Sequence, residues 1–152
     1  MYDPTVQQPG KPVTQFSVML NNRAGALASL LQLLETRYIY CLGFSIQDNQ
    51  EATIVRMILS DPDEALALLL EKGIGFTSCE LLVISLIHGA EDLASCLETL
   101  AQAKINIDFL YPLFPVREGK SRLAIHVADP TSTGKFLNTA GIPILYQEDL
   151  SR

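Results

Sequence analysis

Two kinds of hydrophobic periodicity follow each other near the start of the chain. Apolar and polar residues alternate from Thr14 to Leu20, which predicts a half-buried strand. Leucines then recur at intervals of three and four from Leu27 to Leu34, which predicts an amphipathic helix ending near Thr36. The polar, glycine-containing stretch at residues 21–25 therefore forms an elbow that joins the strand to the helix.

A second set of elements follows this helix. Residues 38–47 are rich in aromatic and β-branched residues and residues 53–59 alternate again, so the polar residues between them predict a hairpin. Asp61 followed by Pro62 predicts a helix start, because aspartate caps free N–H groups and proline fits the first helical position. An extended run from Phe76 to Ile87 comes next and is too long for one ordinary strand.

The same order of elements then recurs at an offset of about 66 to 68 residues. Arg56 is matched by Arg122, and the helix start at Asp61-Pro62 is matched by Asp129-Pro130. The long extended run therefore divides near Glu80 into the last strand of one repeat and the first strand of the next. Because almost no linker joins the repeats, we expect them to pack as one rigid unit.

Each repeat has the order βαββαβ, so the predicted fold is α+β with two ferredoxin-like repeats. Each repeat would form a four-stranded antiparallel sheet with two helices on one face. Residues 1–12 contain three prolines and few apolar residues, which predicts a flexible N-terminal arm. We assign residues 13–79 to the first repeat and residues 80–152 to the second.

Composition and charge narrow the classes of partner. A chain of 152 residues with 48% hydrophobic content is large enough for a packed core, and its net charge of −6 disfavours nucleic acid and anionic membranes as partners. There is no apolar run near the length of a membrane span and no secretory leader, so we expect a cytoplasmic protein. Three scattered cysteines are expected to be buried free thiols: Cys41, Cys79 and Cys96.

The sequence contains no recognisable catalytic or metal-binding motif, so we predict no catalytic residue, no metal and no cofactor. Arg56 and Arg122 are expected in surface ion pairs, although a ligand carboxylate or a dimer interface would also suit them. His88 is expected in an exposed turn and His126 in a structural role. Neither face of the strand at residues 53–59 is wholly polar, which favours association with a partner.

The elbow is the best candidate for a binding site. Asn21 or Asn22 is expected to cap the following helix, while Gly25 leaves the first N–H groups of that helix accessible to a small anion. A capped helix start without any ligand would explain the same residues. The candidate ligand-binding residues are Asn21, Asn22, Arg23, Ala24, Gly25, Ala26 and Leu27.

This stretch, read from Met19 to Ala28 and followed by Tyr38-Ile39-Tyr40, resembles the ACT domain family of small amino-acid-binding regulatory modules. The family's loop usually reads Asp-Arg-Pro-Gly-x-Leu, so Asn22 and Ala24 depart from the pattern while the Gly25 and Leu27 positions match it. The resemblance covers about residues 13 to 148 and both repeats.

The resemblance implies a non-catalytic regulatory protein that binds a free amino acid beside the elbow, near a neighbouring ACT unit. It also implies a homodimer and a metabolic enzyme as a possible partner. In the second repeat Glu91 stands at the position of Gly25 and Asp92 follows it, and both acids would favour the helix dipole themselves and repel a ligand carboxylate. Our hypothesis is that the first repeat keeps the amino-acid site and the second is mainly structural.

Three other functions are compatible with the element order. The first is a protein-interaction or oligomerisation module that works without a ligand. The second is a small ferredoxin-like enzyme, for which Cys41 and His126 are the only weak candidates. The third is an RNA-binding protein, which needs aromatic side chains on the third strand and a basic face. Residues 53–59 and 123–127 contain no aromatic residue other than histidine and the chain is acidic, so this last function is disfavoured.

Overall fold

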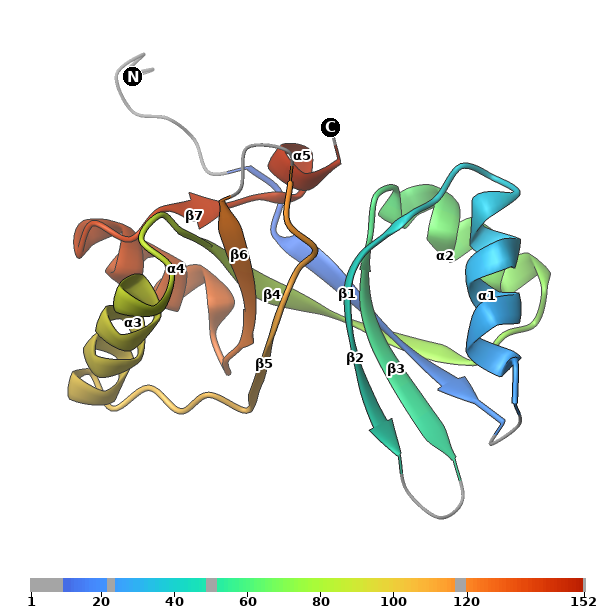
Figure 1. Ribbon diagram of the computed structural model, residues 1–152, viewed down its shortest axis with the longest axis horizontal. Coiled ribbons are helices and arrows are strands. Elements are labelled where there is room, and N and C mark those ends of the chain that lie inside the picture. Colours follow the sequence, from blue (N-terminus) through green and yellow to red (C-terminus); the bar gives the residue numbers. More distant parts are fainter. Residues whose placement is uncertain (1–9, 22–23, 49–51, 117–119, 152) are drawn as a thin grey trace.

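The computed structural model describes residues 10–21, 24–48, 52–116 and 120–151, and it shows the order βαββαβ twice (Figure 1). The first half contains β1 (Val13–Leu20), α1 (Ala26–Glu35), β2 (Cys41–Asp48), β3 (Thr53–Leu59), α2 (Pro62–Glu71) and β4 (Phe76–Leu86). The second half contains α3 (Ala90–Gln102), β5 (Phe109–Pro112), β6 (Ser121–His126), α4 (Pro130–Thr139), β7 (Ile144–Leu145) and the short helix α5 (Gln147–Leu150). The predicted α+β fold of two ferredoxin-like repeats is confirmed.

The strands form a seven-stranded antiparallel sheet in the order β2-β3-β1-β4-β6-β5, with β7 also paired to β4. The extended run that looked too long for one strand is the single strand β4, whose partners change along its length. Val13 of β1 pairs with Leu81, and the next residue, Leu82, pairs with Ile125 of β6. One continuous strand therefore serves both repeats and ties them together covalently and by hydrogen bonds.

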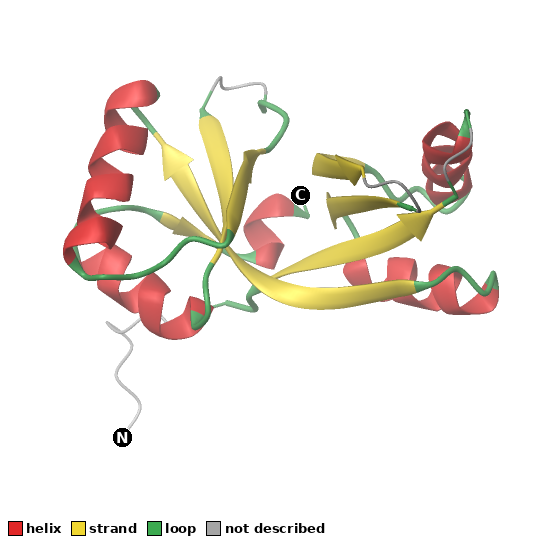
Figure 2. Cartoon of the chain, turned by 90° about the horizontal axis from the view of Figure 1, so that it is seen from below, coloured by secondary structure: helices red, strands yellow, loops and turns green. Residues whose placement is uncertain are grey.

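Helices α1 to α4 lie on the outside of the molecule with the sheets between them, and the short helix α5 lies between the two halves (Figures 1 and 2). The sheet faces that carry no helices pack against each other, so the mixed polarity noted on β3 is satisfied within the chain. This inner contact is a hydrophobic cluster drawn from both repeats, whose buried members are Val13, Ile58, Leu81, Val83, Tyr111, Leu113, Ala124 and Leu150.

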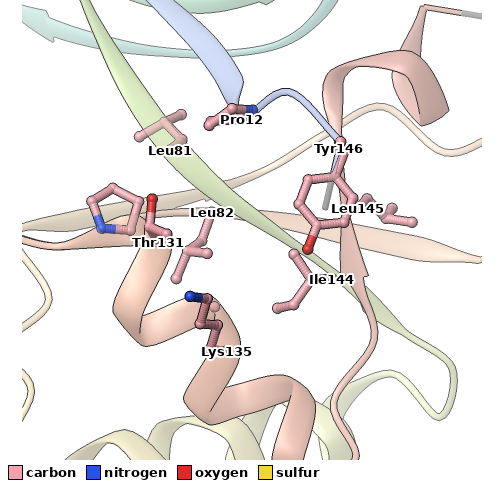
Figure 3. Close-up of a pocket in the computed structure, with 11 residues that line it drawn as sticks. Pro12, Leu81, Leu82, Thr131, Lys135, Ile144, Leu145 and Tyr146 are labelled. Carbon is pink, nitrogen blue, oxygen red and sulfur yellow. The ribbon is translucent and has the colours of Figure 1, made fainter. Parts of the chain in front are cut away.

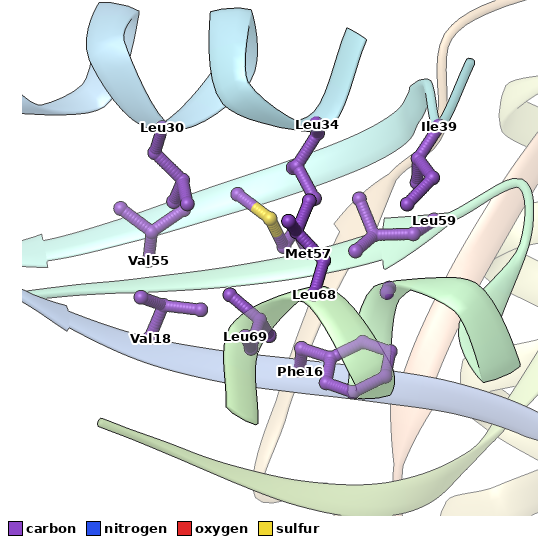
Figure 4. Close-up of a cluster of buried hydrophobic side chains, with 11 residues drawn as sticks. Phe16, Val18, Leu30, Leu34, Ile39, Val55, Met57, Leu59, Leu68 and Leu69 are labelled. Carbon is purple, nitrogen blue, oxygen red and sulfur yellow. The ribbon is translucent and has the colours of Figure 1, made fainter. Parts of the chain in front are cut away.

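Each repeat also has its own core between its sheet and its two helices. In the first repeat Leu30 and Leu34 of α1 and Leu68 and Leu69 of α2 point onto the sheet (Figure 4). In the second repeat Cys96 and Leu100 of α3 take the matching positions, together with Leu137 of α4. Full burial of one such side chain is worth about 1.5–3 kcal/mol, so these stripes fix how the helices lie on the sheets.

Hydrogen bonds cross the contact between the two repeats. The hydroxyl of Tyr111 donates to Oε1 of Gln15 at 2.7 Å, and Nε2 of Gln15 donates to Ser17 Oγ at 3.4 Å and to Cys79 Sγ at 3.5 Å. Gln15 is only 1% exposed, so each of its polar atoms needs a partner in the folded chain. The bond from Tyr111 joins the two repeats and so helps to specify how the second docks on the first.

The two arginines lie at this contact and not in surface ion pairs, so that expectation was wrong. The guanidinium carbon of Arg56 lies over the Phe109 ring, 4.3 Å from its centroid, and the same ring stacks on His126. Arg122 is buried and donates to the carbonyl oxygen of Phe114 at 2.6 Å. Both side chains lie at this contact because the sheet faces that carry no helices meet within the chain. The local sequence does not reveal that these faces meet.

Alkaline solution is expected to weaken the fold through Tyr111 and Cys96. Burial raises the pKa of the Tyr111 hydroxyl and of the Cys96 thiol, so the unfolded chain loses these protons before the folded chain does. Their stabilising contribution is complete below the unfolded pKa values and is lost as pH rises toward the folded ones. The slope is about 1.4 kcal/mol per pH unit per group, starting near pH 8.5 for the thiol and 10 for the phenol.

Urea denaturation at a series of pH values between neutral and strongly alkaline measures this loss. The variant Tyr111→Phe should be less stable at neutral pH, because Gln15 loses its donor. Above the pKa of the phenol in the unfolded chain, the free energy of unfolding of Tyr111→Phe should fall less per pH unit than that of the wild-type chain. An equal slope in both proteins would show that Tyr111 does not titrate on unfolding.

The start of the chain packs against α5. The backbone N–H of Gln147 donates to the carbonyl oxygen of Lys11 at 3.0 Å, and the backbone N–H of Thr14 donates to the side-chain oxygen of Gln147 at 3.1 Å. Residues 10–12 are thereby held next to the second repeat. Residues 1–9 of the predicted arm lie outside the described residues.

Candidate functional site

The elbow of the first repeat borders an open pocket of about 480 Å³. Four of the candidate residues line it: Asn21, Ala24, Gly25 and Ala26. Leu27 packs instead against the first core, and Asn22 and Arg23 lie outside the described residues. We refer to this space as the elbow pocket.

The predicted asparagine cap is wrong. Helix α1 begins at Ala26, and its N-cap residue is Gly25 in the left-handed conformation with φ 85°, which has no side chain to cap the helix. Glycine adopts this conformation without the steric cost that other residues incur. The first intrahelical bond at this end runs from Ser29 N–H to the Gly25 carbonyl at 2.9 Å, which leaves the earlier N–H groups of the helix free of helical partners.

The opposite wall of the elbow pocket is the turn that joins α2 to β4. Gly73, Ile74 and Gly75 line the pocket there, and the carbonyl oxygen of Gly75 accepts a hydrogen bond from Met19 N–H at 3.4 Å. Sequence reasoning missed this wall. The matching Gly-Ile-Pro at residues 141–143 was visible in the repeat, and the structure places it at the matching pocket of the second repeat.

The second elbow borders a smaller pocket of about 190 Å³ and contains its own carboxylate. Oδ2 of Asp92 accepts a hydrogen bond from the backbone N–H of His88 at 2.7 Å, and Oδ1 lies 3.3 Å from the His88 ring. The bond from the His88 backbone is the main reason that the pKa of Asp92 is lowered, with the His88 ring adding to it. A side-chain anion therefore already occupies the elbow of the second repeat.

Of the two acids predicted to repel an anion at the second elbow, Asp92 is the one that lines the pocket. The buried residues of the two helices match at the expected offset, since Leu34 of α1 corresponds to Leu100 of α3. In this alignment of the repeats, Glu91 corresponds to Gly25. Helix α3, however, begins earlier, at Ala90 after Gly89 with φ 63°, so Glu91 lies within its first turn. The acid that lines the pocket is Asp92, and its spacing of four from His88 was the signal in the sequence.

The weak catalytic candidates do not form a reactive pair. The thiol of Cys41 donates to the carbonyl oxygen of Gly43 at 3.4 Å, and burial raises its pKa, which disfavours the thiolate. His126 is held between the Phe109 ring and the Asp108 carboxylate, 2.8 Å from its Nδ1. Over the described ranges, no three His, Cys, Asp or Glu side chains gather as a metal site would require.

The helices are short relative to a bilayer. None of those within the described residues is long and apolar enough to cross a membrane.

A family model described as an ACT domain pair matches residues 11–136 of the chain. A search of curated proteins gave no significant match. Among solved structures, protein BT0572 from Bacteroides thetaiotaomicron is similar with a TM-score of 0.83 and 23% identity, over 93% of this chain and 96% of that one.

Two aspartate kinase regulatory subunits are similar in fold. The ligand-free form from Thermus thermophilus has a TM-score of 0.60 and 15% identity, over 86% of this chain and 93% of its own. The subunit from Thermus flavus has a TM-score of 0.57 and 17% identity, over 86% of this chain and 90% of its own. At these identities the likeness concerns the fold alone.

Proposed function

The chain belongs to the family of ACT domain pairs, and we propose that it is a non-catalytic regulatory protein that binds one free amino acid in its elbow pocket. The observation that carries this proposal is the contrast between the two elbows. The first has an uncapped helix start facing an open pocket, whereas the second has the Asp92 carboxylate in the corresponding place. The first elbow therefore offers hydrogen-bond donors that an external carboxylate can use.

The chemistry of the elbow pocket suits an amino acid. The free N–H groups at the start of α1 and the positive end of the helix dipole favour a carboxylate by about 0.3–1 kcal/mol, and by up to ~2 kcal/mol when partly buried. Asn21 and Ser29 line the same pocket and supply oxygen acceptors for an ammonium group. A ligand of roughly ten heavy atoms then binds in the micromolar to millimolar range, which suits a metabolite sensor.

Regulation requires a partner, and we propose that the chain acts as a cytoplasmic homodimer on a metabolic enzyme. The similarity in fold to regulatory subunits of aspartate kinase supports the proposal of an enzyme partner. The elbow pocket is open on one side, which leaves room for a neighbouring unit to close it.

A thermal-shift screen with the twenty amino acids tests the binding proposal. A ligand present at 100 times its dissociation constant adds about 2.7 kcal/mol of stability, which corresponds to a rise in Tm of about 5–10 °C for a chain of this size. At least one amino acid is expected to give such a shift. The absence of any shift would favour an interaction module that works without a ligand.

A matched pair of variants then locates the site. Ala26 matches Asp92 in the helix register, so Ala26→Asp is expected to place a carboxylate in the first elbow, as Asp92 does in the second. Binding of the amino acid found in the screen should weaken at least tenfold, since about 1.5–3 kcal/mol is lost with hydrogen bonds to a charged group. Isothermal titration calorimetry of this variant measures the effect.

The control is Asp92→Ala, which removes the carboxylate from the second elbow and should leave that affinity unchanged. If Ala26→Asp binds as tightly as the wild-type chain, the amino acid does not bind at the first elbow. If Asp92→Ala weakens binding instead, the second repeat carries the site.

A further inference from the structure

A separate pocket of about 230 Å³ lies where the two repeats join, well apart in the fold from the elbow of the first repeat. Strands β1 and β7 run along the same edge of β4, one beyond the other. Val13 of β1 pairs with Leu81, and Leu145 of β7 pairs with Val83. Neither strand pairs with Leu82, so the edge of β4 is open there and α4 covers the space. We call this space the junction pocket.

The walls of the junction pocket are mainly apolar and come from four separate segments (Figure 3). The arm contributes Pro12, β4 contributes Leu81 and Leu82, and β7 contributes Ile144 and Leu145. Apolar walls on several sides favour a ligand with a hydrocarbon body, because such a ligand leaves water when it binds.

Gly134 lets helix α4, which forms the remaining wall of the pocket, lie close to β4. A Cβ atom at Gly134 of α4 would lie 3.1 Å from Cδ2 of Leu82, so a larger residue would push the helix away from the strand. The small residue therefore keeps α4 against β4 and sets the width of the pocket.

Three polar side chains border this apolar space. Thr131 and Lys135 are four residues apart on α4, so they lie on one face of the helix, and Tyr146 follows β7 on another side of the pocket. Among the described residues, the side chains of Thr131 and Lys135 have no hydrogen-bond or ion-pair partner, whereas Tyr146 takes part in the capping box of α5. Lys135 thus presents a positive charge beside an apolar space without a carboxylate partner from the described part of the chain.

The start of α4 and the arm decide where an anion would bind. The side chain of Asp129 already accepts a hydrogen bond from Ser132 N–H at 3.0 Å, so the helix start is capped. The carboxylate of Glu148 lies against Gly10, which lines one side of the pocket. That side of the pocket is therefore negatively charged. An anionic group would be repelled there and attracted to Lys135.

We propose that the junction pocket is a second ligand site, which takes a small monocarboxylic acid with an apolar body. The hydrocarbon part packs between Leu82 and Ile144, and the carboxylate accepts hydrogen bonds from Lys135 and from the hydroxyl groups of Thr131 and Tyr146. The volume lies below the roughly 300–1,000 Å³ of pockets for drug-sized ligands, so a body of about ten heavy atoms fits it.

This site depends on the duplication and not on the elbow. It lies at the seam between the repeats, so a single repeat would not contain it. It would respond to a compound with no ammonium group, whereas the elbow pocket is proposed to bind a free amino acid. The two sites can therefore be tested one at a time.

The test uses three probes of one shape: phenylacetate, its neutral amide phenylacetamide, and the cation phenethylammonium. All titrations are made on the full chain carrying Ala26→Asp, so that the first elbow cannot bind the carboxylate. Phenylacetate is expected to bind, and the amide and the cation are expected to bind at least about fivefold more weakly, since they lose the charge-assisted bonds. Two-dimensional NMR titration follows the residues of the junction pocket and of both elbows separately.

Variants of Lys135 assign the carboxylate contact. Lys135→Met should weaken phenylacetate binding by about tenfold and leave the amide unchanged, while Lys135→Arg should largely restore the affinity. Lys104→Met is the control for total charge, because this exposed lysine lies in the turn between α3 and β5 and does not line the pocket.

Several outcomes would overturn the proposal. These are the absence of binding by phenylacetate at millimolar concentration, equal binding of all three probes, or an equal loss in Lys104→Met and Lys135→Met. Shifts confined to the elbows would also do so. None of these results bears on the amino-acid screen of the wild-type chain, so a failure here is distinguishable from a failure of the elbow site.

Discussion

Leu34→Ala and Leu100→Ala are each expected to lower the free energy of unfolding by about 2–5 kcal/mol and to affect one shared unfolding transition. These leucines hold matching positions on α1 and α3, and they are 1% and 0% exposed. Each variant leaves a cavity under its own helix. Because β4 belongs to both repeats and the open sheet faces pack together, a loss in either core should destabilise the whole chain.

The measurement is urea denaturation followed by circular dichroism, with a denaturant slope fitted for each variant. A single transition with an unchanged slope in both variants would show that the repeats unfold together. Two transitions, with only one of them shifted in each variant, would show that the repeats unfold independently. Exposed Leu70, which is 65% exposed, gives the control Leu70→Ala with little expected loss.

Much of the fold was predictable because it depends on local periodicity that the chain repeats. The residues predicted for the third strand, 53–59, are those of β3, and Asp61 caps α2 as expected by accepting a hydrogen bond from Glu64 N–H at 3.1 Å. Such elements are specified by neighbours a few residues apart. The match between the repeats then indicated the topology, because one order of helices and strands, βαββαβ, had to account for both halves of the chain.

The contact between the repeats was not predictable from local pattern. Gln15, Arg56 and Arg122 look like surface residues in the sequence, yet the first and third are buried and the second covers the Phe109 ring. Their burial follows from how the two open sheet faces dock, which no short stretch encodes. The polar pattern indicated only that these faces were not purely hydrophobic.

The candidate site was located in part from the sequence. The glycine of the elbow was informative because a left-handed residue before α1 leaves its N–H groups open, but the same geometry excluded the expected asparagine cap. The second elbow was predicted to be negatively charged through Glu91 and Asp92, and of these two acids Asp92 lines the pocket. Helix α3 starts earlier than the aligned helix does, and a shift of this kind decides whether Glu91 or Asp92 faces the pocket.

The two elbows therefore differ in one chemical respect that can be exchanged by substitution. The described lining of the first pocket contains no carboxylate, whereas the second pocket holds the Asp92 carboxylate, which accepts from the backbone N–H of His88. A second anion at Asp92 would have to displace a bound carboxylate, which costs about the same hydrogen bonds that it would gain. We therefore expect one amino acid per chain in the calorimetric titration.

Gly43→Ala is expected to lower the free energy of unfolding by about 1–3 kcal/mol, the usual cost of overpacking. A Cβ atom at Gly43 would lie 2.9 Å from both Cα and Cγ of Leu113, and the backbone atom cannot move aside as a flexible side chain can. Gly43 bridges to Leu113, and Phe114 N–H donates to the carbonyl oxygen of Leu42 at 2.8 Å. The substitution therefore introduces a clash at the point where β2 of the first repeat contacts the residues that follow β5.

Gly75→Ala is the matched control for this prediction. No atom lies within 4 Å of a Cβ placed at Gly75, and its φ is not in the left-handed region, so alanine should be neutral or slightly stabilising there. Urea denaturation compares the two variants. The clash in Gly43→Ala should push the two repeats apart while each repeat keeps its own core. The urea unfolding transition of this variant should therefore also broaden, because the repeats no longer unfold together. An unchanged midpoint and slope in Gly43→Ala would show that β2 and Leu113 are free to move apart, and that the shared strand β4 alone holds the repeats together.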